Sequence, residues 1–439
     1  MNNFKDKKIV ILGFGKEGLS TYEYIRKYEK EMPLVIMDNK YQDIKIEDKN
    51  VLVMDINYDD LKDYDLIFKS PGISFKGMDI SSFKDKITSQ LEYFLENKKG
   101  YVVGITGTKG KSTTSSLIYS IINNQGYKTF LLGNIGNPIF DVMDDIDEES
   151  YVVIEMSSHQ LEYVTKSPDI AIILNLFEEH LDHYDSLDAY YKAKLNIAKF
   201  QGKDDYFLYS SDNEDLKSYK NFIQTESQKY DITFEKKDSS YAYILDNFIV
   251  VNDNKVFDLD NKINLKGRHN VKDIMFALTV ASILNLEEDK TTKAICEFKP
   301  LPHRMELVGT FDGITFYNDS IATIPDATIN AINSLDNIDT LILGGMDRKI
   351  SYEYFIDFLK DSNINNFICL PDTGHYIYEQ IKDIKKAYKV DKMEEAVKIA
   401  KKVTKKGCVC LLSPAASSYG FFKNFEERGN KYKELIERK

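Results

Sequence analysis

Cysteine is scarce in this sequence, and its few copies form no pairing pattern. The 439 residues contain four cysteines, Cys296, Cys369, Cys408 and Cys410, and no C-x-x-C pair. Small secreted domains rely on a dense set of disulfides, and four cysteines in so long a chain do not provide one. The composition therefore indicates a protein of a reducing compartment.

Long apolar segments are also missing. Near its start the chain passes from a charged stretch directly into the short apolar run Ile9–Leu12, without the longer apolar core and small-residue cleavage site of a signal peptide. The longest apolar candidate, 170–177, falls well short of the ~18 residues that a membrane span needs. We therefore expect a cytoplasmic protein that is not inserted into a membrane.

An excess of positive charge is absent as well. Lysine and arginine number 58, aspartate and glutamate number 70, and the net charge is −12. A general nucleic-acid binder needs a basic face to neutralise phosphates, so this balance argues against nucleic acid as a partner. A local basic pocket for a nucleotide stays compatible with it. Hydrophobic residues make up 43% of the chain, which is enough for sizeable cores and excludes wholesale disorder.

Short apolar runs alternate with stretches of helical length along most of the chain. This alternation is typical of parallel sheets covered by helices, the α/β class. The expected strands are 8–12, 34–37, 66–68, 102–105, 152–154, 170–174, 340–343, 366–370 and 409–412. The expected helices include 16–31, 111–125, 186–200 and 352–360.

Two breaks separate three blocks of sequence. A polar stretch at 97–100 ends the first block, and the bends of Lys299-Pro300-Leu301-Pro302 end the second. The predicted domains are 1–97, 98–298 and 299–439, and the chain length suits two to four domains. Within the second block, the charged segment 203–264 contains short strand-like pieces and is expected to form an antiparallel edge.

The strongest motif is a glycine-rich loop at 104–113. Its letters, GITGTKGKST, match G-x-x-x-x-G-K-[ST], and it lies between a predicted strand and a predicted helix. In a phosphate-binding loop the glycines let backbone N–H groups converge on phosphate oxygens, and the following helix adds positive potential. Lys111 is then expected to reach the β- and γ-phosphates, and the Ser112 hydroxyl to bind Mg²⁺. The competing interpretation, a chance glycine turn, does not explain the order of strand, loop and helix.

A second glycine loop, Gly13-Phe14-Gly15-Lys16-Glu17-Gly18, also follows a strand. Asp38 ends the next strand, where a ribose-binding carboxylate lies in dinucleotide-binding folds. From the residues alone, this pattern is compatible with NAD, with another nucleotide, or with a tight turn that binds nothing.

Two further strand ends carry groups that suit a divalent metal. Glu155 follows the strand 152–154, and His180 follows the strand 170–174. The carboxyl ends of parallel strands share one edge of a sheet, so both side chains are expected near the phosphate loop. A lone histidine is more often a structural residue, and it is the shared edge that favours the metal interpretation.

Six later motifs follow in a fixed order. They are Gly267-Arg268-His269-Asn270, Leu301-Pro302-His303-Arg304, Asn318-Asp319-Ser320, Leu343-Gly344-Gly345, Leu412-Ser413-Pro414-Ala415 and Lys423-Asn424-Phe425-Glu426-Glu427-Arg428-Gly429. Together with the phosphate loop they resemble the Mur ligase family, and within it the glutamate-adding members. These are ATP-dependent enzymes that form the amide bonds of the peptidoglycan stem peptide. The resemblance extends from about Ile9 to Gly429.

The resemblance implies three α/β domains with distinct ligands. An N-terminal Rossmann-like domain would hold a uridine nucleotide in place of NAD, a central P-loop ATPase-like parallel sheet would bind ATP, and a C-terminal Rossmann-like α/β domain would bring glutamate. The implied reaction adds D-glutamate to UDP-N-acetylmuramoyl-L-alanine through an acyl phosphate and releases ADP and phosphate. The implied cofactors are ATP, two Mg²⁺ ions and a carbamylated lysine that orders the metals. The expected partners are these small molecules, and the protein is expected to be a monomer.

The family's site residues carry over to this sequence position by position. The catalytic positions are Lys111, His180 and Lys194, and Lys194 is the lysine expected to be carbamylated. The expected ATP contacts are Gly107, Thr108, Lys109, Gly110, Lys111, Ser112, Thr113, Asn270, Arg304 and Asp319. The expected UDP-substrate contacts are Gly13, Phe14, Gly15, Asp38, Ser70, Pro71, Gly72 and Asn134. The expected glutamate contacts are His183, Thr323, Lys349, Ser418 and Phe425, and the expected metal ligands are Ser112, Glu155, His180 and Lys194.

The sequence departs from the family pattern at two positions. Ile321 stands where many glutamate-adding members have a lysine, and Lys109 replaces the usual asparagine of the phosphate loop. The first change removes a cation near the glutamate pocket, so ligation of L-glutamate is kept as an alternative. The loop after Gly345 is one residue off, so Arg348 is an alternative to Lys349.

Three other functions compete with the ligase. A nicotinamide dehydrogenase built on the loop 13–18 leaves the phosphate loop and both later blocks unexplained. A folylpolyglutamate-type ligase would not need the N-terminal nucleotide domain. A non-catalytic nucleotide-binding module is disfavoured because all the predicted catalytic and metal-binding residues occur together.

Overall fold

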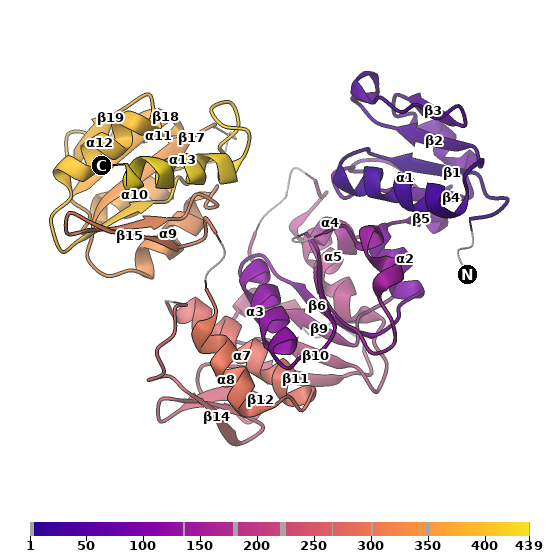
Figure 1. The fold of residues 1–439 in the computed structure, drawn as a ribbon, viewed down its shortest axis with the longest axis horizontal. Coiled ribbons are helices and arrows are strands. Elements are labelled where there is room, and N and C mark those ends of the chain that lie inside the picture. Colours follow the sequence, from indigo (N-terminus) through magenta and orange to yellow (C-terminus); the bar gives the residue numbers. More distant parts are fainter. Residues whose placement is uncertain are drawn as a thin grey trace. The chain divides into compact units, whose positions relative to one another are not determined.

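Three sheets form the centres of the fold in the computed structural model, which describes residues 4–134, 137–178, 183–219, 225–265, 267–299, 302–347 and 352–438. The contacts divide the chain into two units. The first consists of Met1–Ile263 with His269–Phe298 and holds two sheets, and the second consists of Asn264–Arg268 with Lys299–Lys439 and holds the third. Figure 1 shows each sheet with its helices.

The first sheet has five parallel strands in the order β3-β2-β1-β4-β5. They are β1 (Ile9–Leu12), β2 (Leu34–Met37), β3 (Val51–Met54), β4 (Leu66–Lys69) and β5 (Ile87–Thr88), accompanied by the helices α1 (Lys16–Tyr28) and α2 (Gln90–Glu96). All residues of the central strand β1 are buried, which explains its unbroken apolar run.

The second sheet has nine strands in the order β14-β13-β12-β11-β10-β9-β6-β8-β7. They are β6 (Tyr101–Thr106), β7 (Thr129–Gly133), β8 (Tyr151–Glu155), β9 (Ile170–Ile173), β10 (Tyr206–Tyr209), β11 (Gln228–Ile232), β12 (Ser240–Leu245), β13 (Phe248–Val251) and β14 (Asn254–Asp258). The helices are α3 (Lys111–Asn124), α4 (Ser158–Leu161), α5 (Leu187–Lys199), α6 (Glu214–Tyr219), α7 (Arg268–Ile283) and α8 (Glu288–Glu297). Strand β6 pairs in parallel with both β8 and β9, so the loop after β6 opens between two neighbouring strand ends.

The expectation of an antiparallel edge at 203–264 is correct only for its second half. Strands β10 and β11 run parallel to β9, and β12 pairs in parallel with β11. The helix α6 lies between β10 and β11 and supplies the crossover that a parallel pair needs. In the described part of this segment, only β12, β13 and β14 form antiparallel hairpins. Their turns, Asp246-Asn247 and Asn252-Asp253, have φ values of +48°, +64°, +49° and +59°, as two-residue hairpin turns require.

The third sheet has six strands in the order β15-β16-β20-β17-β18-β19. They are β15 (Glu306–Phe311), β16 (Ile314–Asn318), β17 (Ile338–Gly345), β18 (Asn366–Asp372), β19 (Lys386–Lys389) and β20 (Val409–Leu412). The helices are α9 (Pro325–Asn333), α10 (Glu353–Asp361), α11 (Thr373–Ile381), α12 (Met393–Val403) and α13 (Phe425–Glu437). Only the edge pair β15 and β16 is antiparallel.

Every strand and helix expected from the sequence overlaps an observed one, and the α/β class with three parallel-sheet domains is confirmed. The residue boundaries of the three domains stay predictions. Among the described residues, no helix combines the length and the apolar character that crossing a membrane requires.

Candidate functional site

The predicted phosphate loop lies where its motif requires. Strand β6 ends at Thr106 and helix α3 begins at Lys111, so the loop between them presents the helix N-terminus. Gly110 has a φ of +85°, and a Cβ there would lie 2.9 Å from the Asp273 Oδ1 atom of helix α7. The left-handed backbone therefore favours glycine at this position, and a larger residue would also displace the Asp273 side chain.

The side chain of Lys111 folds back over this loop. Its Nζ donates to the main-chain oxygens of Gly107 at 2.9 Å and Thr108 at 3.1 Å. The ammonium is thus held at the loop, where the phosphates of a nucleotide would lie. Ser112 and Thr113 are buried in the first turn of α3.

Asn175, just beyond β9, braces the phosphate loop from the neighbouring strand. Its Oδ1 accepts hydrogen bonds from the N–H groups of Thr108 at 3.1 Å and Lys109 at 2.8 Å, and its Nδ2 donates to the Lys109 oxygen at 3.1 Å. The Thr108 hydroxyl also accepts from the Phe177 N–H at 2.9 Å. Asn175 was not predicted as a site residue, although it directly follows a predicted strand at the same edge.

Glu155, at the end of β8, has one carboxylate oxygen engaged and one unused. Its side chain is buried, Oε1 accepts from the Asn134 Nδ2 at 2.8 Å, and Oε2 has no hydrogen-bond partner among the described residues. A buried carboxylate oxygen without a donor is costly unless a cation compensates it. Together with the Ser112 hydroxyl, it provides hard oxygen ligands that fit Mg²⁺.

The structure gives no position for the predicted metal ligand His180. This histidine lies in the segment 179–182, outside the described residues. In the described part of the chain no group of three or more His, Cys, Asp or Glu side chains is arranged to hold a metal.

Lys194, on helix α5, reaches the same loop. Its side chain is buried, and its Nζ donates to the Gly107 oxygen at 3.0 Å and lies 4.9 Å from the centre of the Tyr190 ring. The Tyr190 hydroxyl contacts the Thr108 hydroxyl at 3.2 Å. Lys111 and Lys194 thus converge on one main-chain oxygen, as the prediction of a shared site requires.

The remaining predicted ATP contacts are divided between the two units. Asn270 is buried on α7, one turn before Asp273. Arg304 and Asp319 belong to the second unit. Asp319 is buried, accepts from the Ser413 hydroxyl at 2.8 Å and from the Met305 N–H at 3.2 Å, and burial raises its pKa to about 7.

The N-terminal glycine loop is tied to its own strand ends. The Phe14 N–H donates to Asp38 Oδ2 at 2.7 Å, and the Ser70 hydroxyl donates to the Gly13 oxygen at 2.7 Å. Gly13 has a φ of +89°, and a Cβ there would lie 2.9 Å from the Ser70 Cβ. Gly15, Pro71 and Gly72 occupy the same loops. The structure therefore brings the predicted UDP-substrate residues of the first sheet together. Asn134, the remaining predicted residue, donates its hydrogen bond to Glu155 of the second sheet.

The predicted glutamate contacts are divided between the two units. Thr323, Ser418 and Phe425 belong to the second unit, His183 belongs to the first, and Lys349 lies outside the described residues. His183 contacts Glu162, with 3.2 Å between Nε2 and Oε2. The Phe425 oxygen accepts from the Ser320 hydroxyl at 2.8 Å.

Arg428 is a second residue that the site prediction missed. Its fully buried guanidinium donates from Nε to the Ser320 hydroxyl at 3.0 Å, from Nη2 to the Ser320 oxygen at 2.7 Å and from Nη1 to the Ala416 oxygen at 3.1 Å. It thereby joins its own motif to the motif of Ser320 and to the residue that follows Leu412-Ser413-Pro414-Ala415.

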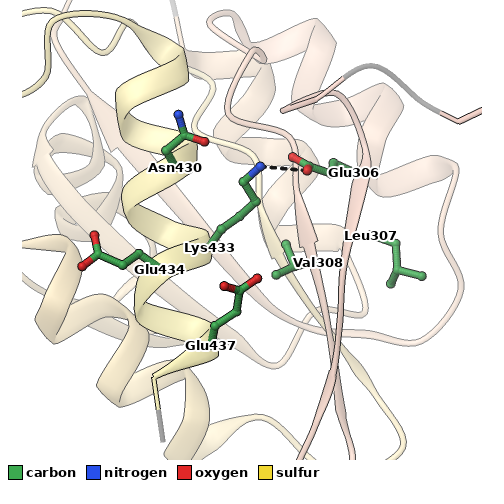
Figure 2. A pocket seen from close by; sticks show the side chains of 7 residues that line it. All are labelled: Glu306, Leu307, Val308, Asn430, Lys433, Glu434 and Glu437. Atoms are coloured by element: carbon green, nitrogen blue, oxygen red, sulfur yellow. Dashed lines mark hydrogen bonds and ion pairs between the residues drawn. The ribbon is translucent and has the colours of Figure 1, made fainter.

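A separate pocket of the second unit carries none of the predicted site residues. Figure 2 shows it between β15 and α13, where the Lys433 Nζ donates to the Glu306 Oε1 at 2.9 Å.

Comparison with protein families matches nearly the whole chain in three segments. Residues 7–89 match the Mur ligase MurD-like N-terminal domain, 105–281 the Mur ligase middle domain and 303–416 the Mur ligase glutamate ligase domain. The UDP-N-acetylmuramoylalanine--D-glutamate ligase of Clostridium tetani is 33% identical, and the alignment covers 99% of this chain and 98% of that protein. The enzyme of the same name from Acetivibrio thermocellus is 32% identical over 99% of this chain and 98% of its own length.

The chain belongs to the Mur ligase family.

Solved Mur ligases have the same fold. The MurC ligase of Thermotoga maritima matches with a TM-score of 0.62 at 19% identity, covering 98% of both chains. The MurF ligase of the same organism, solved in complex with ADP, matches with a TM-score of 0.59 at 17% identity, covering 99% of this chain and 96% of its own. This membership confirms the resemblance that the ordered motifs indicated.

Proposed function

We propose that this Mur ligase joins D-glutamate to UDP-N-acetylmuramoyl-L-alanine, with ATP as the energy source. The single observation that carries the proposal is a shared contact in the phosphate loop. Lys111 and Lys194 both donate to the Gly107 oxygen of this loop, next to the strand that ends at Glu155. The full-length relatives that carry the D-glutamate ligase name support the choice of substrates. The loss of a lysine at Ile321 keeps L-glutamate as the alternative to test.

The reaction needs activation of a carboxylate, because a carboxylate is a poor acyl donor at neutral pH. An oxygen of the substrate carboxylate attacks the γ-phosphorus of ATP, and the bond to ADP breaks. The glutamate amine then attacks the acyl carbon, loses a proton, and phosphate leaves with the bonding electrons. The first step brings two anions together, so the site must supply positive charge.

The described residues supply this charge at the phosphate loop. The Lys111 ammonium is held over the loop, and the N–H groups at the start of α3 point toward the same space. When bound, Mg²⁺ would add charge neutralisation, and Ser112 and Glu155 would hold it through oxygen atoms. The proposal also includes a second Mg²⁺ ion, His180 as a metal ligand and carbamylation of Lys194.

The residues proposed to bind the two ends of the reaction's substrates come from both units. The loops around Gly13, Asp38 and Ser70 would take the uridine nucleotide. Thr323, Ser418 and Phe425 in the second unit would take glutamate, together with His183 and Lys349, while Asn270, Arg304 and Asp319 would contact ATP. We further propose that the enzyme acts as a monomer in the cytoplasm.

Product formation tests the proposal directly. Purified protein is incubated with ATP, Mg²⁺ and UDP-N-acetylmuramoyl-L-alanine, with D-glutamate in one reaction and L-glutamate in a second, and products are identified by mass spectrometry. Product with D-glutamate alone is the expected result. Product with L-glutamate alone would overturn the substrate assignment but retain the ligase, whereas ATP binding without product would favour a binding module.

A further inference from the structure

Glu162, which no part of the site prediction includes, contacts two positively chargeable groups from separate parts of the first unit. Its Oε2 lies 3.7 Å from the Lys69 Nζ and 3.2 Å from the His183 Nε2. Lys69 ends β4 of the first sheet, whereas Glu162 follows α4 and His183 precedes α5, both of the second sheet. One carboxylate therefore links the two sheets.

The pair of Lys69 and Glu162 is enclosed. The Lys69 side chain is 2% exposed and that of Glu162 is 19% exposed. The Lys69 ammonium lies 5.9 Å from the centre of the Phe75 ring and 5.6 Å from that of Tyr163. Burial lowers the pKa of Lys69, and the charges of Glu162 and Glu17 oppose that effect. An ammonium in such surroundings depends on its carboxylate partner.

A second polar link runs beside the first. The Gln160 Nε2, on α4, donates to the Glu17 Oε1 in the first turn of α1 at 2.8 Å. Burial raises the pKa of Glu17. The Ser74 hydroxyl donates to the His183 oxygen at 2.9 Å. All these contacts join residues in or beside the predicted UDP-binding loops to residues that follow Glu155 or precede α5.

Each partner of the Lys69–Glu162 contact lies next to a segment of the predicted site. Lys69 directly precedes Ser70, whose hydroxyl bonds to Gly13 of the glycine loop. Glu162 lies one short helix beyond Glu155, the predicted metal ligand. Any shift of one partner therefore moves either the proposed UDP-binding turn or the segment that carries the proposed metal ligand. A buried ion pair contributes little net stability compared with an apolar pair, but it fixes one relative placement of its two sides.

We propose that Glu162 is a positioning residue, which through Lys69 and His183 sets the proposed UDP-substrate loops in register with the phosphate loop. The inference rests on the proposed ligase function. It predicts that loss of the Glu162 charge impairs use of the UDP-substrate, which must reach from one sheet to the other, more than use of ATP, which the phosphate loop binds by itself.

The test is steady-state kinetics of the full-length Glu162→Gln variant with each substrate varied in turn. The amide side chain of this variant keeps a polar group toward His183 but leaves the Lys69 charge unpaired. We expect the KM for UDP-N-acetylmuramoyl-L-alanine to rise roughly tenfold, and kcat to fall by a similar factor, because small misplacements of reacting groups have effects of this size or larger. The KM for ATP is expected to stay within about twofold of the wild-type value, since its loop is held by other contacts.

Two further proteins separate positioning from stability. In the double variant Lys69→Met, Glu162→Gln neither charge of the pair remains, so its melting temperature should return toward that of the wild type. Its KM for the UDP-substrate should remain raised, because the link is still missing. The matched control is Asp144→Asn, which removes an exposed ion pair between Lys27 of α1 and Asp144, with 2.7 Å between the charged atoms. It should leave both KM values unchanged.

The outcomes distinguish this inference from the proposed function. Absence of ligation by the wild-type protein would contradict the function itself. With an active wild type, an equal rise of both KM values, unchanged kinetics in Glu162→Gln, or full recovery of the UDP-substrate KM in the double variant would each overturn the positioning role. A selective rise that persists in the double variant supports it.

Discussion

The Nζ of Lys194 donates a hydrogen bond to the main-chain oxygen of Gly107 at 3.0 Å, across 87 residues of sequence. The Lys111 Nζ donates to the same oxygen at 2.9 Å. Two ammonium groups, of which that of Lys194 is buried, thus share one acceptor, although like charges repel each other. Carbamylation of Lys194 would turn one of these cations into an anion and still leave an N–H to donate to Gly107.

A Lys194→Met variant should therefore lose activity without losing its fold. We expect kcat to fall by about 10²–10³-fold, as when one group that stabilises developing charge is removed. The matched control is Lys192→Met on the same helix, because Lys192 is 58% exposed and pairs with Asp188 at the surface. Intact-protein mass spectrometry in bicarbonate buffer should show a carbamyl adduct on the wild type and none on the variant. Wild-type activity in Lys194→Met would contradict its assigned role.

Asn175→Ala should weaken ATP binding. The substitution removes three hydrogen bonds to Thr108 and Lys109, each worth about 1 kcal/mol, so the loop loses its brace. We expect the KM for ATP to rise by roughly tenfold or more, the equivalent of at least about 1.4 kcal/mol. The exposed Asn124, at the end of α3, provides the control variant Asn124→Ala. A rise confined to the UDP-substrate KM would contradict a role at the phosphate loop.

The parts of the site that could be predicted are those that depend on neighbouring residues. The phosphate loop is complete within ten residues of sequence, and its strand and helix flank it directly. The brace by Asn175 depends on the pairing of β9 with β6 and joins residues 66 and 67 positions apart. No local pattern specifies such a contact, although the rule that parallel strand ends share an edge could have drawn attention to Asn175.

The sequence did not indicate that two of its predicted sites are in contact. Asn134 was expected at the UDP-substrate and Glu155 at the metal, yet the two side chains bond to each other at 2.8 Å. Pairing of β7 with β8 brings their ends together, and strand pairing is decided by tertiary structure. The prediction of an antiparallel edge at 203–264 was wrong for its first half for the same reason. The helix α6 connects β10 to β11, so that β11 runs parallel to β10.

The burial of Arg428 could not be predicted from its surroundings in sequence. The helix α13 reads FEERGNKYKELIE, a run of charges that is typical of a solvated helix face. Tertiary packing turns this arginine toward the motifs of Ser320 and Ala416, and only the Arg-Gly pair of the family pattern marked the position.

His303 should make the second unit less stable in acid. Its side chain is buried, the Asn318 Nδ2 lies 2.9 Å from its Nδ1, and burial lowers its pKa. The unfolded state takes up a proton near the ordinary value of 6.5. Below that pH the unfolded state binds more protons than the folded state, so the free energy of unfolding decreases as the pH falls.

The test compares the wild type with His303→Gln, which cannot titrate. Hydrogen–deuterium exchange of peptides from β16 is measured at about pH 7.5 and about pH 5.5, on either side of the ordinary histidine pKa, after correction for intrinsic exchange. The wild type should lose protection on acidification by at most about 1.4 kcal/mol per pH unit, and the variant should lose less. An equal loss in both proteins would show that another group controls the acid response.

Arg428→Met should destabilise the second unit more strongly than any surface change. The variant leaves the Ser320 and Ala416 oxygens buried without their donor, and hydrogen bonds from a charged group are worth more than neutral ones. We expect a loss of roughly 2–4 kcal/mol, measured by urea unfolding with exchange of β20 and α13 peptides as the local readout. Arg438→Met is the control, since Arg438 is 63% exposed and pairs with Glu434 at the surface.

Because Arg428 joins the loops of Ser320, Ala416 and Phe425, its loss should also raise the KM for glutamate. An unchanged glutamate KM in a destabilised variant would limit Arg428 to stability alone.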